Sequence, residues 1–219
     1  MDKEAQIAFE QGALRLGLNP GGHVWPALEV WVDELLKWNA KVNLTAITQP
    51  LEVVEKHLLD SLSVLPEVAG AATLLDLGAG AGLPGIPLAI ALPELAVTMV
   101  DAVSKKVTFL KQVIVKLGLV PRVRAVHVRA AGLLEAEKLS QAEVVIARAL
   151  MDLDQWLPFA LPYLAPGGRL VAMLARPPSM KSLTELAQQY GLRVASLRSF
   201  TLPSSGDPRT VASFQMGST

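Results

Sequence analysis

The segment from Leu74 to Gly85, LLDLGAGAGLPG, carries the clearest chemical signal in this chain. It starts as an apolar run, passes through the carboxylate of Asp76 and continues into closely spaced glycines. Glycine can adopt backbone angles closed to other residues and places no side chain between the main chain and a ligand. Pro84 suits the first turn of a helix, whose free N–H groups would face the same spot. The segment therefore predicts a strand that leads into a ligand-binding loop.

Two cofactor signatures fit this loop. Gly80, Gly82 and Gly85 have the spacing of a dinucleotide loop, whereas Asp76 begins the pattern D-x-G-x-G-x-G. A carboxylate repels a pyrophosphate in a partly dry pocket and attracts the ammonium and sulfonium groups of S-adenosylmethionine. We therefore expect Asp76 to meet this cationic methyl donor, with a nicotinamide-dependent oxidoreductase as the alternative. A glycine-rich turn that only packs a helix on a sheet is the third interpretation.

A second acid supports nucleoside binding. The run from Val97 to Asp101 reads as another strand that ends in a carboxylate, about twenty-five residues after the first. An acid at this place hydrogen-bonds the ribose diol in nucleoside-binding folds. Asp101 is therefore a candidate ribose ligand in either cofactor class.

Composition limits the classes of protein that remain. The chain has 219 residues, enough for one full domain with a modest extension. No apolar stretch reaches the roughly eighteen residues of a membrane span, and the charged N-terminus lacks the pattern of an export signal. The absence of cysteine excludes disulfides, thiolate nucleophiles and cysteine metal sites. We expect a cytoplasmic protein with no membrane contact.

Charge is unevenly distributed although the formal net charge is zero. The stretch from Ala102 to Leu134 holds no Asp or Glu but seven basic residues, namely Lys105, Lys106, Lys111, Lys116, Arg122, Arg124 and Arg129. Such an asymmetry indicates a polyanionic partner on one face, with a solvated helix face as the alternative.

The hydrophobic period changes along the chain. Residues 1 to about 66 have helical spacing in three segments, of which the third runs from Leu51 to Leu65, and we expect a helical extension over residues 1–70. Strands and helices then alternate over residues 71–219, which predicts an α/β fold with a mostly parallel seven-stranded sheet. The link before Pro208 is too short for a crossover helix, so the last two strands should form an antiparallel hairpin. The candidate strands are Leu74 to Leu77, Val97 to Asp101, Val123 to Val128, Val144 to Ala147, Arg169 to Leu174, Val194 to Phe200 and Thr210 to Phe214, with helices beginning near Pro84, Ser104, Leu133, Asp154 and Pro178.

The candidate functional residues should lie together at the carboxyl ends of the predicted strands. Asp76, Asp101, Arg129, Arg148 and the segment after Leu174 each follow a predicted strand, and such ends form one crevice in a parallel sheet. No evident triad or metal-ligand spacing accompanies them. His127 lies in a predicted buried strand and is expected to be structural. Further polar residues interrupt the apolar sequence of the predicted N-terminal helices. They could either dock these helices on the sheet or contribute to the active site. These residues are Asn39, Asn43, Thr45, His57, Asp60 and Ser61.

Five short motifs occur in a defined order. They are W-N-x-x-x-N-L-T at 38–45, H-x-x-D-S-L at 57–62, D-L-G-x-G-x-G-x-P-G at 76–85, K-K-x-x-F-L at 105–110 and A-R-A at 147–149. Only the glycine loop is specific alone, but the ordered set resembles the bacterial small-subunit ribosomal RNA methyltransferase G family, also called glucose-inhibited division protein B. The resemblance extends from about Leu35 to Phe214.

The resemblance implies a Rossmann-like class I methyltransferase that moves a methyl group from S-adenosylmethionine to nitrogen-7 of a guanine in 16S ribosomal RNA. That nitrogen has a free lone pair, so no general base is required. The implied partner is this RNA or its assembling particle, and the protein is expected to be a monomer without a metal. The implied catalytic residues are Asn43, His57 and Arg148; the cofactor-binding residues are Asp76, Gly78, Ala79, Gly80, Gly82, Leu83, Pro84, Asp101, Ala102, Ala130, Ala131 and Arg148; and the RNA-binding residues are Lys105, Lys106, Arg129 and Arg176.

Two positions depart from the family pattern. Ala131 stands where the family has a glutamate after the Arg129 motif, and Leu174 stands where it has a lysine. Arg176 could return a cation from the next turn of chain, although its backbone before Pro177 is biased toward extended angles. The departures leave a cofactor-binding member with lost or altered RNA specificity as the alternative function.

Overall fold

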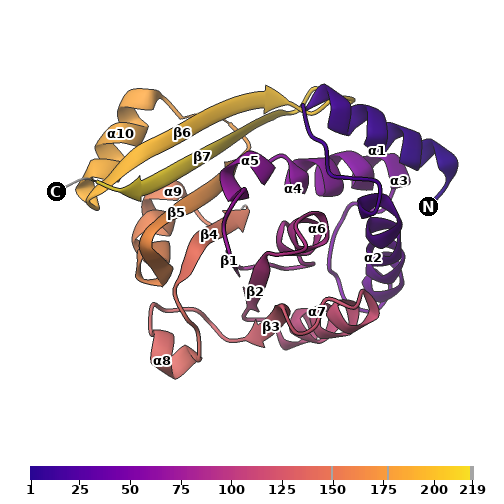
Figure 1. The fold of residues 1–219 in the computed structure, drawn as a ribbon, viewed down its shortest axis with the longest axis horizontal. Helices are drawn as coiled ribbons and strands as arrows, with labels where there is room; N and C mark the ends of the chain where they lie inside the picture. Colours follow the sequence, from indigo (N-terminus) through magenta and orange to yellow (C-terminus); the bar gives the residue numbers. More distant parts are fainter. Residues whose placement is uncertain (149, 177, 218–219) are drawn as a thin grey trace.

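The computed structural model describes residues 1–148, 150–176 and 178–217, so Ala149 of the A-R-A motif and Pro177 lie outside the described residues. Its centre is one seven-stranded sheet in the order β3-β2-β1-β4-β5-β7-β6 (Figure 1). The first five strands are parallel, and β7 runs antiparallel between β5 and β6. The strands are β1 (Thr73–Leu77), β2 (Ala96–Asp101), β3 (Val123–His127), β4 (Ala142–Arg148), β5 (Leu164–Leu174), β6 (Leu192–Thr201) and β7 (Pro208–Met216).

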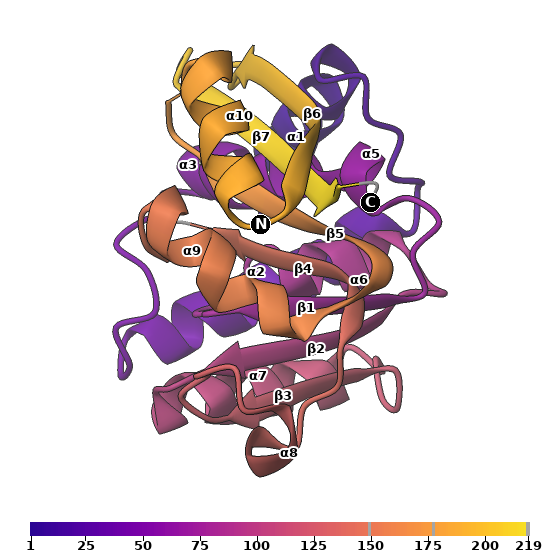
Figure 2. The same cartoon turned by 90° about the vertical axis from the view of Figure 1, so that its left-hand side faces the viewer.

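Helices cover both faces of this sheet, as parallel strands require. Helices α6 (Gly85–Ala91) and α7 (Ser104–Lys116) lie on one face together with the N-terminal helices. Figure 2 shows α9 (Leu153–Ala160) and α10 (Met180–Gln189) across the opposite face, with the short α8 (Leu134–Glu137) at the β3 edge. A 3-10 turn, η2 (Leu161–Tyr163), joins α9 to β5. Each face therefore has its own apolar core.

The predicted strands and the C-terminal hairpin are confirmed, and all five helices begin within two residues of the expected positions. Strand β5 begins five residues earlier than predicted, because Leu164 pairs with Ala142 before an irregularity in the ladder. The expectation for His127 was wrong in one respect: its side chain is exposed at the end of β3, where Nε2 lies 3.1 Å from the Ala102 carbonyl oxygen.

The N-terminal helices are α1 (Lys3–Arg15), α2 (Val24–Asn39), α3 (Pro50–Val53), the π-helix η1 (Val54–Leu59), α4 (Asp60–Leu62) and α5 (Leu65–Val68). The third predicted segment is helical over most of its length, and a six-residue π-helix interrupts it. π-Helical turns are rare in proteins, and those that occur are often found at functional sites. The N-terminal helices share a single core with α6 and α7, so they pack as part of the same body.

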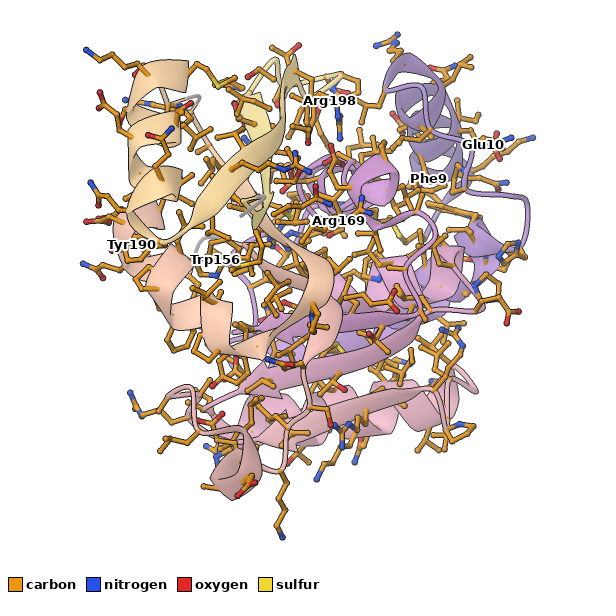
Figure 3. All side chains as sticks on the ribbon, turned by 60° about the vertical axis from the view of Figure 1, so that its left-hand side comes forward. Phe9, Glu10, Trp156, Arg169, Tyr190 and Arg198 are labelled. Atoms are coloured by element: carbon orange, nitrogen blue, oxygen red, sulfur yellow. The ribbon has the colours of Figure 1, made fainter. Side chains whose placement is uncertain are left out.

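Polar contacts fix the C-terminal hairpin to the N-terminal helices. The backbone N–H groups of Ser204 and Ser205 donate to the Glu55 carboxylate. Arg198 binds both carboxylate oxygens of Glu67, whose backbone carbonyl accepts from Arg169. Figure 3 shows Arg169 and Arg198 together beside α5. The hairpin therefore closes one side of the crevice at the strand ends.

None of the helices within 1–148, 150–176 and 178–217 has both the length and the apolar character of a membrane span.

Candidate active site

Two adjoining cavities lie at the carboxyl ends of the parallel strands, and Arg148 lines both. The glycine-loop cavity has a volume of about 520 Å³ and is lined by Leu77, Gly78, Val100, Asp101, Ala102, Lys106, Val128, Arg129, Ala130, Arg148, Leu150, Met151 and Phe159. The arginine cavity has a volume of about 320 Å³ and is lined by Ile47, Lys56, His57, Asp60, Arg148, Met173, Leu174, Ala175, Phe200, Arg209, Thr210 and Val211. The predicted crevice is therefore present, divided in two by one arginine.

Asp101 connects the glycine loop to the second strand. Its Oδ2 accepts from the Gly80 backbone N–H at 2.9 Å, and its Oδ1 accepts from the Val103 N–H at 2.8 Å. Each carboxylate oxygen has two acceptor positions, so each can take a further donor. The two hydroxyls of a ribose match these remaining positions. Asp101 therefore has free acceptor positions, and its role as a ribose ligand stays a prediction.

Gly78 brings the main chain to the cavity wall. Its φ is +75°, a conformation that L side chains rarely adopt. A Cβ atom built at this position would lie 2.5 Å from Leu150 Cδ1, so a larger residue would displace that side chain. The N–H groups of Gly78 and Ala79 both donate to the Val100 carbonyl oxygen. The turn therefore requires glycine for its conformation and for its close approach.

Asp76 lines neither cavity, and its predicted direct contact with the ligand stays a prediction. The side chain is fully buried beneath the loop, where Oδ2 accepts from the Gly85 N–H at 2.9 Å. Burial raises the pKa of this carboxyl to about 7. Within the described residues Oδ1 has no hydrogen-bond partner. An acceptor without a donor at this place could accept from a positively charged group bound at the loop, and that contact would favour the charged form of Asp76.

Only part of the predicted cofactor set reaches the cavity. Gly78, Asp101, Ala102, Ala130 and Arg148 line it. The loop turns inward after Gly80 to begin α6, and residues 81–90 are all buried. This burial keeps Gly82, Leu83 and Pro84 out of the wall, and the other predicted residues that do not line it are Asp76, Ala79, Gly80 and Ala131.

An ion cluster centred on the buried Asp60 lines the arginine cavity. Arg148 Nη1 donates to Asp60 Oδ2 at 3.1 Å and to the Lys56 carbonyl oxygen at 2.9 Å. Arg209 Nε donates to the other oxygen, Asp60 Oδ1, at 3.1 Å. Burial raises the pKa of Asp60, and the two guanidinium groups oppose that shift. One carboxylate therefore orients two arginines toward one small space.

His57 is buried next to this cluster, on the π-helix. Its Nε2 lies 2.8 Å from Thr45 Oγ1, and its Nδ1 lies 3.1 Å from the Lys56 carbonyl oxygen. A carbonyl can only accept, so Nδ1 carries the proton and Nε2 accepts from the Thr45 hydroxyl. Burial and then the charge of Arg148 lower the pKa of His57 to about 4. The imidazole is therefore neutral at pH 7, with both nitrogens engaged.

Asn43 is exposed and lines neither cavity, so its predicted catalytic role is not supported. The nearby Asn39 shapes the loop instead. Its Oδ1 accepts from the backbone N–H groups of Leu44 and Thr45, and its Nδ2 donates to the Thr45 carbonyl. The motif that holds both asparagines thus positions Thr45, and through it His57.

The predicted RNA-binding residues divide into two groups. Lys106 and Arg129 line the glycine-loop cavity, whereas Lys105 and Arg176 are exposed outside both cavities. Two other basic residues of the same stretch are engaged within the protein: Lys116 pairs with Glu34 at 2.6 Å, and Arg122 donates to carbonyl groups at the end of α6 and in the loop after it.

Sequence reasoning missed Arg209 and Phe200. Both lie in the C-terminal hairpin, more than fifty residues after Arg148 in sequence, and no local motif marks them. The only available signal was a pair of polar and aromatic residues at the ends of two predicted strands.

The strand order with an antiparallel β7, together with the glycine loop and the acid at the end of β2, defines a Rossmann-like methyltransferase. The family model GidB, described as rRNA small subunit methyltransferase G, matches residues 25–202. The chain belongs to this family.

Similar proteins agree with that assignment. Ribosomal RNA small subunit methyltransferase G of Myxococcus xanthus is 57% identical over 211 residues, which cover 96% of each chain. The protein of the same name from Anaeromyxobacter sp. is 48% identical over 212 residues, covering 97% of this chain and 98% of that one. A SAM-dependent methyltransferase from Thiobacillus denitrificans, solved with S-adenosylhomocysteine, shares the fold at a TM-score of 0.54 and 13% identity, covering 72% of this chain and 90% of that chain.

Proposed function

We propose that this chain transfers a methyl group from S-adenosylmethionine to nitrogen-7 of a guanine in small-subunit (16S) ribosomal RNA, with the cofactor in the glycine-loop cavity and the guanine in the arginine cavity. The single observation that carries this arrangement is that Arg148 lines both cavities. A methyl group can pass directly between two ligands only if their sites meet. The shared wall supplies that meeting point.

The glycine-loop cavity suits S-adenosylmethionine, whose sulfonium supplies an electrophilic methyl group. Asp101 would hold the ribose hydroxyls, and Ala102 and Ala130 would border the nucleoside. Among the described residues Asp76 Oδ1 has no donor, so a bound cation would favour the charged form of a carboxyl that burial otherwise keeps neutral. These residues bind and orient the donor.

The arginine cavity suits a purine base turned out of its stack. Phe200 and Ile47 offer apolar surface for a base to stack on, and Arg148 and Arg209 can donate to its carbonyl oxygen. Asp60 pairs with both arginines, so its one negative charge offsets one of their two positive charges. That compensation matters because methylation at nitrogen-7 leaves a positive charge on the purine.

The residues around this cavity fit a transfer that needs no general base. His57 is neutral and has both nitrogens engaged, so it is a poor proton acceptor at this pH. Nitrogen-7 already has a lone pair, and positioning of the two reactants can supply much of the rate. We assign His57 to holding the π-helix and the Lys56 carbonyl under Arg148.

The exposed Lys105, the cavity residues Lys106 and Arg129, and Arg176 are proposed as contacts to the RNA. We also propose a cytoplasmic monomer that acts on this RNA or its assembling particle. The division into a helical extension, 1–70, and a methyltransferase unit, 71–219, remains a prediction.

Mass spectrometry of nucleosides from small-subunit RNA tests the function. Cells that lack this protein should lose one 7-methylguanosine, which the intact gene restores and Arg148→Ala does not. Unchanged 7-methylguanosine in the deleted strain would refute the proposal. Tight binding of S-adenosylhomocysteine without any RNA product would favour a cofactor-binding member with lost or altered RNA specificity, and Leu174 in the arginine cavity wall motivates that outcome.

A nicotinamide-dependent oxidoreductase is the less supported alternative. The dinucleotide fold has an open sheet in the order 3-2-1-4-5-6, whereas this sheet inserts an antiparallel strand between β5 and β6. Titration with NAD should show no binding under conditions in which S-adenosylhomocysteine binds.

A further inference from the structure

Glu137 and Tyr163 are buried polar residues just beyond the glycine-loop cavity, and neither lines it. Glu137 ends α8, and Tyr163 lies in the turn η2. The tyrosine hydroxyl donates to Glu137 Oε2 at 2.6 Å. Burial and this carboxylate raise the pKa of Tyr163 to about 12, so the hydroxyl keeps its proton. The two residues form one polar cluster, here called the Glu137–Tyr163 cluster.

The cluster accepts three consecutive backbone N–H groups. Ala131 N donates to Glu137 Oε1 at 2.6 Å, and Leu133 N donates to the same oxygen at 3.2 Å. Gly132 N donates to the Tyr163 hydroxyl at 2.7 Å. Successive N–H groups that converge in this manner make an anion-binding nest. The protein's own carboxylate fills the nest, so the segment 131–133 is fixed in the absence of any ligand.

The same stretch of chain is anchored at its other end. Val128 N donates to the Asp101 carbonyl oxygen at 3.3 Å. Arg129 and Ala130 lie between the two anchors, and both line the glycine-loop cavity. Fixed points on either side hold these wall residues in place before a ligand arrives, which reduces the ordering cost of binding.

Tyr163 also supports a second part of the wall. Its ring meets Phe159 edge to face, with centroids 6.2 Å apart. Phe159 lines the cavity from α9. Tyr163 thus contacts Glu137 through its hydroxyl and the apolar wall through its ring.

We propose that the Glu137–Tyr163 cluster positions the wall formed by Arg129, Ala130 and Phe159, and so sets the affinity for the nucleoside part of the cofactor. The inference rests on the proposed function, because it takes the glycine-loop cavity as the cofactor site. Both side chains are positioning residues that act through the main chain and through Phe159. They contribute to binding of the donor and not to the transfer step.

Calorimetric titration of S-adenosylhomocysteine into the full chain tests this role. The Kd should rise about tenfold in Glu137→Gln and about threefold in Tyr163→Phe, because each change removes or weakens buried hydrogen bonds. The KM for S-adenosylmethionine should rise in parallel, whereas kcat at saturating donor should stay unchanged. A purely structural role would not separate KM from kcat in this way.

Two matched controls are available. Glu135 is exposed on the same short helix, and Glu135→Gln should leave the Kd unchanged. Tyr190 is the other of the two tyrosines, and its hydroxyl makes only a 3.4 Å contact at the surface by α10 (Figure 3). Tyr190→Phe should likewise bind as the wild type does.

Wild-type affinity in Glu137→Gln and Tyr163→Phe, with a lower melting temperature, would reduce the cluster to a structural role and overturn the inference. A fall in kcat with unchanged Kd would overturn it as well. If Glu137→Gln does not fold, Tyr163→Phe carries the test, since it removes a single oxygen atom. Failure of the wild type to bind S-adenosylhomocysteine would instead refute the proposed function.

Discussion

The two cavities that meet at Arg148 are built in different ways. The glycine-loop cavity is formed largely by consecutive stretches at the ends of β1, β2 and β3, and its polar contacts are mostly to the main chain. The arginine cavity is assembled from the π-helix, the end of β4 and the C-terminal hairpin, and its contacts join distant side chains. A site made of backbone tolerates few changes of conformation, whereas a site made of ion pairs depends on every partner being present.

The contrast extends to the buried titratable groups. Asp76 lies beneath the glycine loop with its pKa raised to about 7, and His57 lies beside the arginine cluster with its pKa lowered to about 4. Burial disfavours the charged form in both cases, which is an anion in one and a cation in the other. Burial therefore favours the neutral form of Asp76 beneath the glycine loop and the neutral form of His57 beside the arginine cluster.

Removing Arg148 should have the largest effect, because among the residues that the structure describes it alone lines both cavities. We expect Arg148→Ala to slow methyl transfer by about 1,000-fold, since Asp60 loses one of its two partners and the reactants lose their shared wall. The affinity for S-adenosylhomocysteine should fall much less. Transfer rates and calorimetry on the same variant check this, with the exposed Arg124→Ala as the control. Equal losses of rate and affinity would point to a structural arginine.

Asp76 and His57 should change the free energy of unfolding in opposite directions as the pH rises. The folded pKa of His57 lies below its ordinary value of 6.5, so its contribution is lost as the pH falls from about 6.5 to about 4. The folded pKa of Asp76 lies above its ordinary value of 3.8, so its contribution is lost as the pH rises from about 4 to about 7. The two slopes oppose each other over most of this range.

A variant that lacks one of the two groups should therefore reveal the pH dependence that the other group gives to the free energy of unfolding. In Asp76→Asn the free energy of unfolding should rise with pH between about 4 and 6.5, by up to about 3 kcal/mol. In His57→Gln it should fall with pH between about 4 and 7, by a similar amount. Urea unfolding at several pH values measures both. Slopes of the same sign in the two variants would disprove the assignment.

Loss of Asp101 should affect the donor side alone. Asp101→Ala removes the acceptor for two backbone N–H groups and for the ribose, and we expect the Kd for S-adenosylhomocysteine to rise about thirtyfold. The exposed Asp154→Ala serves as the control. An unchanged Kd would mean that the ribose lies elsewhere.

Surface lysines should have the smallest effect. Lys105 is exposed, whereas Lys116 is paired with Glu34. We expect Lys105→Ala to weaken RNA binding about threefold and to reduce the salt dependence by about one counterion. Lys116→Ala should change neither quantity. Filter binding over a range of salt concentrations distinguishes the two, and equal effects would argue against a specific RNA face.

The comparison also explains what the sequence could predict. The loop, its strand and Asp101 follow one another closely, and their spacing reflects backbone geometry, so the fold and the place of Asp101 beside the loop were predictable. The burial of Asp76 was not, because spacing does not tell whether a strand-end carboxylate faces the ligand or the core. Arg209, Phe200 and Glu137 are brought to the site only by the tertiary arrangement, and Asn43 was named from a motif whose structural work is done by Asn39.

The separation of donor and acceptor sides is the central claim, and Phe200 tests it most directly. Phe200 lines only the arginine cavity, so Phe200→Ala should slow methyl transfer to RNA and leave the affinity for S-adenosylhomocysteine within about twofold of the wild type. Titration of S-adenosylhomocysteine into this variant is the decisive measurement. An unchanged Kd is predicted, and a Kd that rises as steeply as the transfer rate falls would contradict the account.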